Sequence, residues 1–118
     1  MVKGHREAEH LAAEWMRWFG YYDAVATQAT RDGGLDVTSE HAVAQVKMEG
    51  TRIAPSPIQA LVGIASVVGK KALFFSLTGY SLAARSFANL ADVALFEFAI
   101  DGDVIPVNQL ARTYFDRN

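Results

Sequence analysis

Two apolar runs of strand length, residues 72–77 and 93–99, place the strongest constraint on how this chain can fold. Both runs lack polar alternation, as expected for strands buried on both faces of a parallel sheet. The segment between them, residues 81–90, has apolar residues at helical spacing. Two strands joined by a helix form a parallel pair with a right-handed crossover. The chain is therefore predicted to be an α/β protein.

The remaining segments place further helices and strands around this unit. The predicted helices are residues 5–19, 58–68, 81–90 and 107–115, with Ser56 as the cap of the second, stops at Gly20 and Gly69, and a turn at Asp101-Gly102. Alternating or extended segments at 21–28, 35–38 and 42–48, with a turn at 31–34, predict a three-stranded antiparallel meander. We therefore expect a mixed sheet of about five strands with helices packed on it.

Length and composition fit one globular domain spanning residues 1–118. The sequence has no cysteine, which excludes disulfides, thiolate metal sites and cysteine nucleophiles. The first ten residues lack the apolar core of a signal peptide, and no window approaches the roughly 20 apolar residues of a membrane span. We therefore expect a cytoplasmic protein without membrane contact.

A polar constellation lies between residues 33 and 47. The chain has Gly33-Gly34-Leu35-Asp36 and, further on, Gln45-Val46-Lys47. Side chains alternate along a strand, so Gln45 and Lys47 share a face, and Asp36 on the neighbouring strand can converge with them. A carboxylate can hold a divalent ion that polarises a phosphodiester, while a lysine positions water. The pattern also fits a turn-ending Asp36, a solvated Gln45 and a Lys47 that snorkels from a strand edge.

The run DGGLDVTSEHAVAQVK, residues 32–47, resembles the core motif of the Mrr-like restriction endonucleases of the PD-(D/E)xK nuclease superfamily, in a QxK variant. The similarity extends to Glu9 and its helix, the Gly20-Tyr21 end of that helix, the helix carrying Gln59 and the Thr78-Gly79 turn. It covers about residues 7–111. The resemblance implies a restriction-endonuclease-like three-layer α/β/α sandwich with a mixed central sheet of about five strands. It also implies a metal-dependent endonuclease that hydrolyses DNA phosphodiester bonds.

The same resemblance implies roles for individual residues. Asp36 is expected to bind Mg²⁺ or Mn²⁺, with Glu9 as the second carboxylate or its partner. Gln45 is expected to ligate through an amide oxygen, which adds no charge, and Val46 through its backbone carbonyl. Lys47 is expected to position the attacking water and to stabilise negative charge.

Charge is unevenly distributed along the chain. Residues 44–90 contain five basic residues and one acid, a formal charge of +4, whereas the rest, with six basic and twelve acidic residues, carries −6. The residues expected to contact DNA are Gln59, Lys70, Lys71, Thr78 and Arg85. Gln59 also fits a polar residue at the rim of a helix, and Lys70-Lys71 also fits a solvated strand end. Because the attraction of one acidic chain to DNA is local and weak, we expect a homodimer with one active centre near each strand.

Histidines do not form a recognisable zinc motif. His5 and His10 are five residues apart, out of phase with the four-residue spacing of helical zinc ligands. His41 lies between predicted strands, where a solvated turn is expected.

Three alternatives remain open. The first is a Holliday junction resolvase, which usually has an acidic residue where this chain has Gln45. The second is an inactive DNA-binding module of the same fold, although Asp36 and Lys47 are both present. The third is a nuclease that works only within a larger complex.

Overall fold

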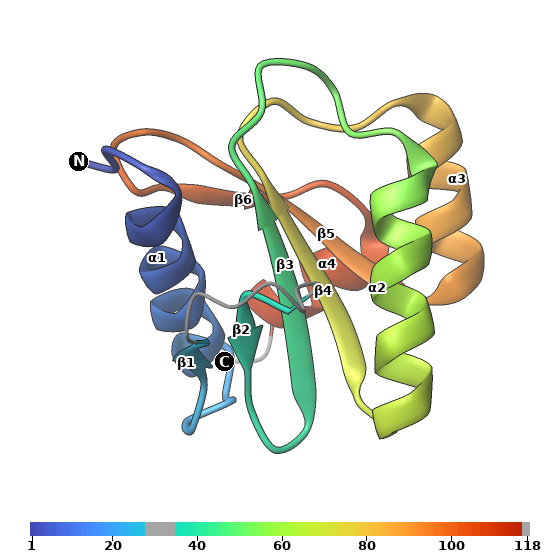
Figure 1. Cartoon of the computed structure of the whole chain (residues 1–118), viewed down its shortest axis with the longest axis horizontal. Coiled ribbons are helices and arrows are strands. Elements are labelled where there is room, and N and C mark those ends of the chain that lie inside the picture. Colours follow the sequence, from blue (N-terminus) through green and yellow to red (C-terminus); the bar gives the residue numbers. More distant parts are fainter. Residues whose placement is uncertain (28–34, 117–118) are drawn as a thin grey trace.

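A mixed sheet forms the centre of the computed structural model, which describes residues 1–27 and 35–116 (Figure 1). Within these ranges the sheet has six strands in the order β1-β2-β3-β4-β5-β6. The strands are β1 Val25–Ala26, β2 Val37–Thr38, β3 Ala42–Lys47, β4 Lys71–Ser76, β5 Val93–Phe98 and β6 Val104–Pro106. The predicted turn at residues 31–34 lies outside the described residues.

Strand directions agree with the sequence patterns. β1, β2 and β3 pair antiparallel, which confirms the meander, although β1 and β2 are only two residues long. β3, β4 and β5 pair parallel, which confirms the crossover unit. The antiparallel β6 was not predicted and extends the expected five strands to six. It is only three residues long and ends in a proline, so the sequence shows no alternating pattern that would predict a strand there.

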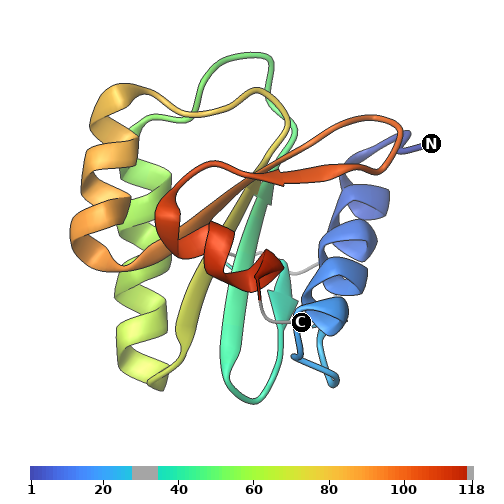
Figure 2. The same cartoon turned by 180° about the vertical axis from the view of Figure 1, so that it is seen from behind.

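Four helices cover the two faces of the sheet within the described ranges (Figures 1 and 2). They are α1 His5–Trp18, α2 Pro55–Val68, α3 Leu82–Ala91 and α4 Gln109–Phe115. Apolar residues of α1 and α4 share one core with the sheet, and those of α2 and α3 share a second core on the opposite face. The three-layer α/β/α sandwich is therefore confirmed.

The start of α2 corrects one prediction. Ser56 is not the cap, because the helix begins one residue earlier, at Pro55, with Ala54 in the N-cap position. Pro55 and Pro57 both lie in the first turn, where a missing backbone N–H costs no intrahelical hydrogen bond. The two prolines are therefore compatible with a helix that begins before Ser56 and includes this serine in its first turn.

The parallel strands bring their carboxyl ends to one edge of the sheet. Lys47 of β3 is in register with Ser76 of β4, which is in register with Glu97 of β5. The loop after β3 is tied to the same edge by a bridge between Ile53 and Tyr80. No helix among the described residues is long and apolar enough to cross a bilayer.

Candidate active site

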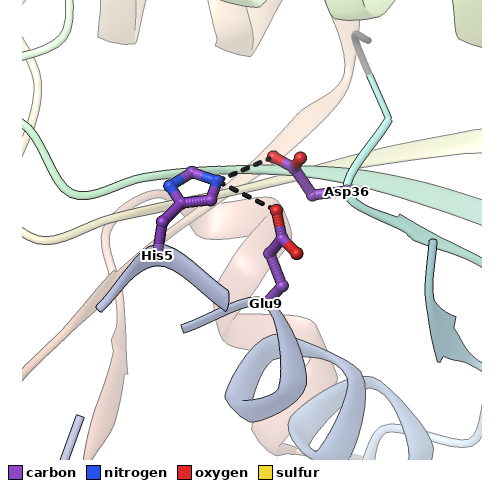
Figure 3. Close-up of side chains that lie close together, drawn as sticks. All are labelled: His5, Glu9 and Asp36. Carbon is purple, nitrogen blue, oxygen red and sulfur yellow. Dashed lines mark ion pairs between the residues drawn. The ribbon is translucent and has the colours of Figure 1, made fainter. Parts of the chain in front are cut away.

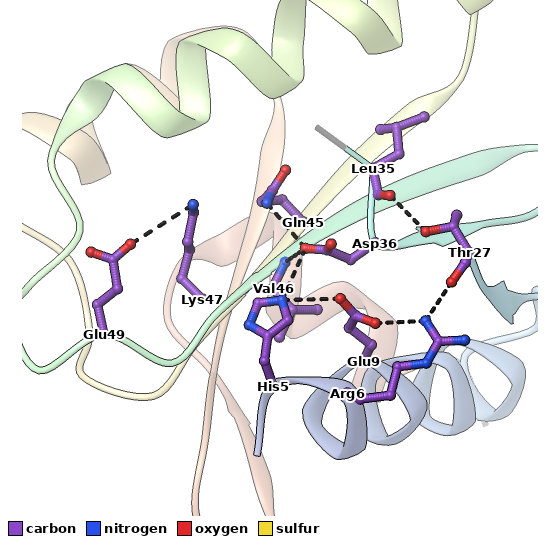
Figure 4. A network of polar contacts seen from close by, with 10 residues as sticks. All are labelled: His5, Arg6, Glu9, Thr27, Leu35, Asp36, Gln45, Val46, Lys47 and Glu49. Carbon is purple, nitrogen blue, oxygen red and sulfur yellow. Dashed lines mark hydrogen bonds and ion pairs between the residues drawn. The ribbon is translucent and has the colours of Figure 1, made fainter. Parts of the chain in front are cut away.

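Asp36 immediately precedes β2 and lies beside β3. Its backbone N–H donates to the carbonyl of Ala44, the residue that pairs with Val37, at 2.8 Å. The next β3 N–H facing β2, that of Val46, donates instead to Asp36 Oδ2 at 2.8 Å (Figure 4). Gln45 Nε2 donates to the same oxygen at 3.0 Å. The carboxylate therefore replaces a backbone partner of the sheet and is held in a defined position.

Glu9 reaches this carboxylate from α1, which packs over the same end of β2 and β3. Glu9 is 8% exposed, and its two oxygens have different partners. Oε1 lies 2.8 Å from Arg6 Nη1, which also donates to the Thr27 carbonyl. Oε2 lies 3.0 Å from His5 Nε2. Since Arg6 neutralises one side of the carboxylate, the other side is directed towards His5 and Asp36 (Figure 3).

His5 completes a group of three convergent side chains. Its Nε2 atom is 3.8 Å from Asp36 Oδ2 as well as 3.0 Å from Glu9. One ligand atom from each of His5, Glu9 and Asp36 lies within 4.8 Å of the others. Two carboxylates and an imidazole are donors that divalent cations accept, so the donor set fits a metal ion.

Burial and charge raise the pKa of Asp36 above its ordinary value of 3.8. Burial of the carboxyl group is the main cause, and the neighbouring Glu9 carboxyl adds to it. The Val46 N–H and the charge of His5 act in the opposite direction. Ionisation of both carboxyl groups is thus unfavourable in the metal-free protein, and a divalent cation between them would offset their repulsion.

Lys47 lies two residues beyond Gln45 on β3, on the same face of the strand (Figure 4). Its side chain is 31% exposed, and Nζ is 3.8 Å from Glu49 Oε1. An exposed pair at this separation is weak and can open when a phosphate competes for the ammonium group. The structure thus places Lys47 beside Gln45 with an acid partner that the sequence analysis did not consider.

Gln45 and Val46 both contact Asp36, and neither contact was predicted. The amide nitrogen of Gln45, rather than its oxygen, faces Asp36, so the side chain orients the carboxylate. Val46 contacts the same carboxylate through its N–H. Metal ligation by the Gln45 oxygen or the Val46 carbonyl stays a prediction.

Three of the residues expected to contact DNA lie beyond the strand ends or on helices. Gln59 is exposed on α2. Thr78 follows β4, and its hydroxyl donates to the Thr51 carbonyl. Arg85 is exposed in the first turn of α3 and donates to the Val107 carbonyl at 3.3 Å. Thr78 and Arg85 therefore lie on the segment that leaves the Lys47 edge of the sheet.

Lys70 and Lys71 lie at the opposite end of the parallel strands. Lys71 is in register with Ala42, at the start of β3, whereas Lys47 is at its end. At about 3.3 Å per residue, this separates the two ends by roughly 16 Å. Lys70 Nζ also donates to the Ser39 carbonyl at 2.7 Å. The structure does not bring these lysines to Asp36 and Lys47, and their contact with DNA stays a prediction.

His5 was not predicted to belong to this group. Its spacing of five residues from His10 matches no zinc motif. The informative partner is Glu9, four residues after His5, because this spacing places both side chains on one face of a helix.

A match to a known protein family identifies the family of this chain. The Mrr catalytic-domain model, described as a restriction endonuclease, matches residues 3–99, more than half of the chain. This chain belongs to the Mrr restriction endonuclease family. As an Mrr-type chain it is a nuclease domain whose substrate is DNA, and the divalent metals typical of such nucleases agree with the donor set. Neither the curated proteins nor the solved structures contain a match.

Proposed function

We propose that this chain is a metal-dependent endonuclease of the Mrr restriction type, which hydrolyses DNA phosphodiester bonds with Asp36, Glu9 and Lys47. One observation carries the proposal: the Glu9 and Asp36 carboxylates, from different elements, converge beside the Gln45-Val46-Lys47 strand. A structural carboxylate needs no second acid close to it. The crowding of two acids is therefore better explained by a cation site.

Each residue of the site has a separate task in this proposal. Asp36 and Glu9 provide the negative charge that holds Mg²⁺ or Mn²⁺. When bound, the ion supplies Lewis-acid stabilisation of the charge that develops on the phosphate. Gln45 and the Val46 N–H keep Asp36 in place. Lys47 leaves Glu49, orients the attacking water and donates to a phosphate oxygen.

Cleavage of supercoiled plasmid DNA tests this function. We expect the parent chain to convert the plasmid to nicked or linear DNA with Mg²⁺ or Mn²⁺ and to be inactive in EDTA. Asp36→Asn and Lys47→Ala should each lower the rate by about 10²-fold or more, because each removes a ligand or a charge used in the transition state. Asp92→Asn and Lys3→Ala, both at exposed positions, are the matched controls. Parent-like cleavage by either site variant would refute the proposal.

We also propose that the active form is a homodimer. The described part of one chain offers one site of this kind, and a double-strand break requires two hydrolytic events. A two-fold pair of identical chains would place one site near each strand. Light scattering of the purified chain with and without a short duplex tests this, and double-strand cutting by a strict monomer would contradict it.

A further inference from the structure

The donor set of the site differs from an all-oxygen magnesium site. We infer that His5 is a direct metal ligand and that it makes the site selective for a first-row transition ion, Mn²⁺, over Mg²⁺. This inference rests on the proposed function, because it concerns the same ion. It adds a third protein ligand and a preference for one of the two proposed ions.

The positions of the ligand atoms support direct ligation. Atoms bound to one ion at about 2.1 Å are about 3.0–3.4 Å apart in octahedral or tetrahedral geometry. His5 Nε2 is 3.0 Å from Glu9 Oε2 and 3.8 Å from Asp36 Oδ2. The first separation already falls in this range, and the second requires a shift of only a few tenths of an ångström.

The surroundings of His5 leave the imidazole free to move by this amount. Its side chain is 48% exposed and lies in the first turn of α1, so a small rotation does not disturb the core. Glu9, in contrast, is fixed by Arg6, and Asp36 by Val46 and Gln45. Two fixed carboxylates with one adaptable imidazole form an open site that can close around an ion.

The chemistry of the donors leads to the choice of ion. Mg²⁺ strongly prefers oxygen ligands and near-ideal octahedral geometry, whereas transition ions accept imidazole. Gln45 presents its amide nitrogen to Asp36, so this structure shows no further oxygen ligand from that residue. An imidazole nitrogen therefore takes the third position, and Mn²⁺ tolerates the mixed set better than Mg²⁺ does.

Calorimetry with Mn²⁺ and with Mg²⁺ alone, both at about pH 8, tests the inference. We expect the parent chain to bind Mn²⁺ at least about tenfold more tightly than Mg²⁺, and His5→Gln to lose about tenfold or more of the Mn²⁺ affinity. Mg²⁺ affinity should change much less. His10→Gln is the matched control, because His10 lies on the same helix and lines a different hollow, with Trp15 and Trp18.

A spectroscopic readout separates ligation from an electrostatic effect. Electron spin echo measurements on the Mn²⁺-loaded protein should show a directly coordinated nitrogen that His5→Gln removes and His10→Gln retains. His5→Glu, which replaces the imidazole with an oxygen ligand, should shift the preference towards Mg²⁺. Unchanged or tighter Mn²⁺ binding by His5→Gln, or no nitrogen signal in the parent chain, would overturn the inference.

The outcomes also separate this inference from the proposed nuclease function. If the parent chain cuts plasmid DNA but His5→Gln binds Mn²⁺ as well as the parent, only the inference fails. If the nitrogen signal and the affinity loss are found but no DNA is cut, the ligand assignment stands and the nuclease proposal fails.

Discussion

The Asp36 carboxylate is held in place but is costly to ionise in the metal-free protein. The Val46 N–H and Gln45 Nε2 both donate to it, yet its pKa is raised by burial and by Glu9. A raised folded pKa means that the folded state holds its proton more tightly than the unfolded state. The free energy of unfolding therefore falls as the pH rises from about 4 through the folded pKa.

Asp36→Asn should consequently stabilise the metal-free protein while it lowers the rate of cleavage by about 10²-fold or more. Asparagine keeps an oxygen acceptor for the Val46 N–H and removes the crowded charge. In EDTA at pH 7 we expect a modest increase in Tm over the parent chain, modest because water partly screens the carboxyl group. The difference should shrink as the pH approaches about 4. A lower Tm at pH 7 would show that the carboxylate stabilises the fold.

Gln45 determines how much negative charge the site contains. Gln45→Glu would place a third carboxylate at the position that now donates to Asp36. In EDTA this repulsion should lower Tm, whereas Mg²⁺ affinity measured by calorimetry should rise by about tenfold. The rate of cleavage need not increase. Unchanged Mg²⁺ affinity would mean that the side chain at position 45 does not approach the ion.

At the scale of elements, Asn108 anchors α4 against the sheet. Its Oδ1 atom accepts from the backbone N–H groups of Ala111 and Leu95, each at 3.1 Å. Its Nδ2 atom donates to the Val93 carbonyl at 2.8 Å and to Asn89 Oδ1 at 3.1 Å. This buried side chain therefore caps a helix and joins it to β5.

The caps of α4 and α3 should therefore contribute different amounts to the free energy of unfolding. Asn108→Ala should lower the free energy of unfolding by about 2–4 kcal/mol, because it removes a cap and leaves buried groups without partners. Ser81→Ala removes only the cap of α3, at its contact with the Ala84 N–H, and should cost about 1 kcal/mol. Chemical denaturation measures both values. Equal losses would indicate that α4 is not anchored through Asn108.

At the scale of the whole molecule, the basic residues of the +4 segment lie at two ends of the sheet. Exposed Arg52 and Arg85 lie on the loop after β3 and the helix after β4, at the Lys47 edge, whereas Lys70 and Lys71 lie at the opposite edge. If DNA binds at Lys47, as proposed, the duplex would contact the first pair. It reaches the second pair only if it runs along the strands.

Salt dependence of DNA binding distinguishes these two paths. Replacing Arg52 and Arg85 with alanine should lower the slope of log affinity against log salt by about 2, since each phosphate contact contributes about 0.9. The Lys70→Ala and Lys71→Ala pair, measured in parallel, lowers the slope equally only if the duplex extends along the strands. An unchanged slope in the arginine pair would place the DNA elsewhere.

The sequence was sufficient for features that depend on near neighbours along the chain. Periodicity predicted the four helices and the parallel unit, because a side chain's face within one element follows from its spacing. Hairpin geometry brought Asp36 to Gln45 in the same way, since antiparallel neighbours are close in sequence. Strand alternation likewise placed Lys47 on the same face as Gln45. The resemblance to a nuclease family supplied Glu9, without a distance from Glu9 to Asp36.

Only the tertiary structure decided which elements meet. His5 joins Glu9 and Asp36 because α1 packs over β2 and β3, a contact set by burial of residues far apart in sequence. Lys70 is separated from Lys47 because parallel strands align their starts with starts and their ends with ends. Local spacing specifies the face of a side chain, whereas the partner that this face meets depends on how the whole chain buries its apolar surface.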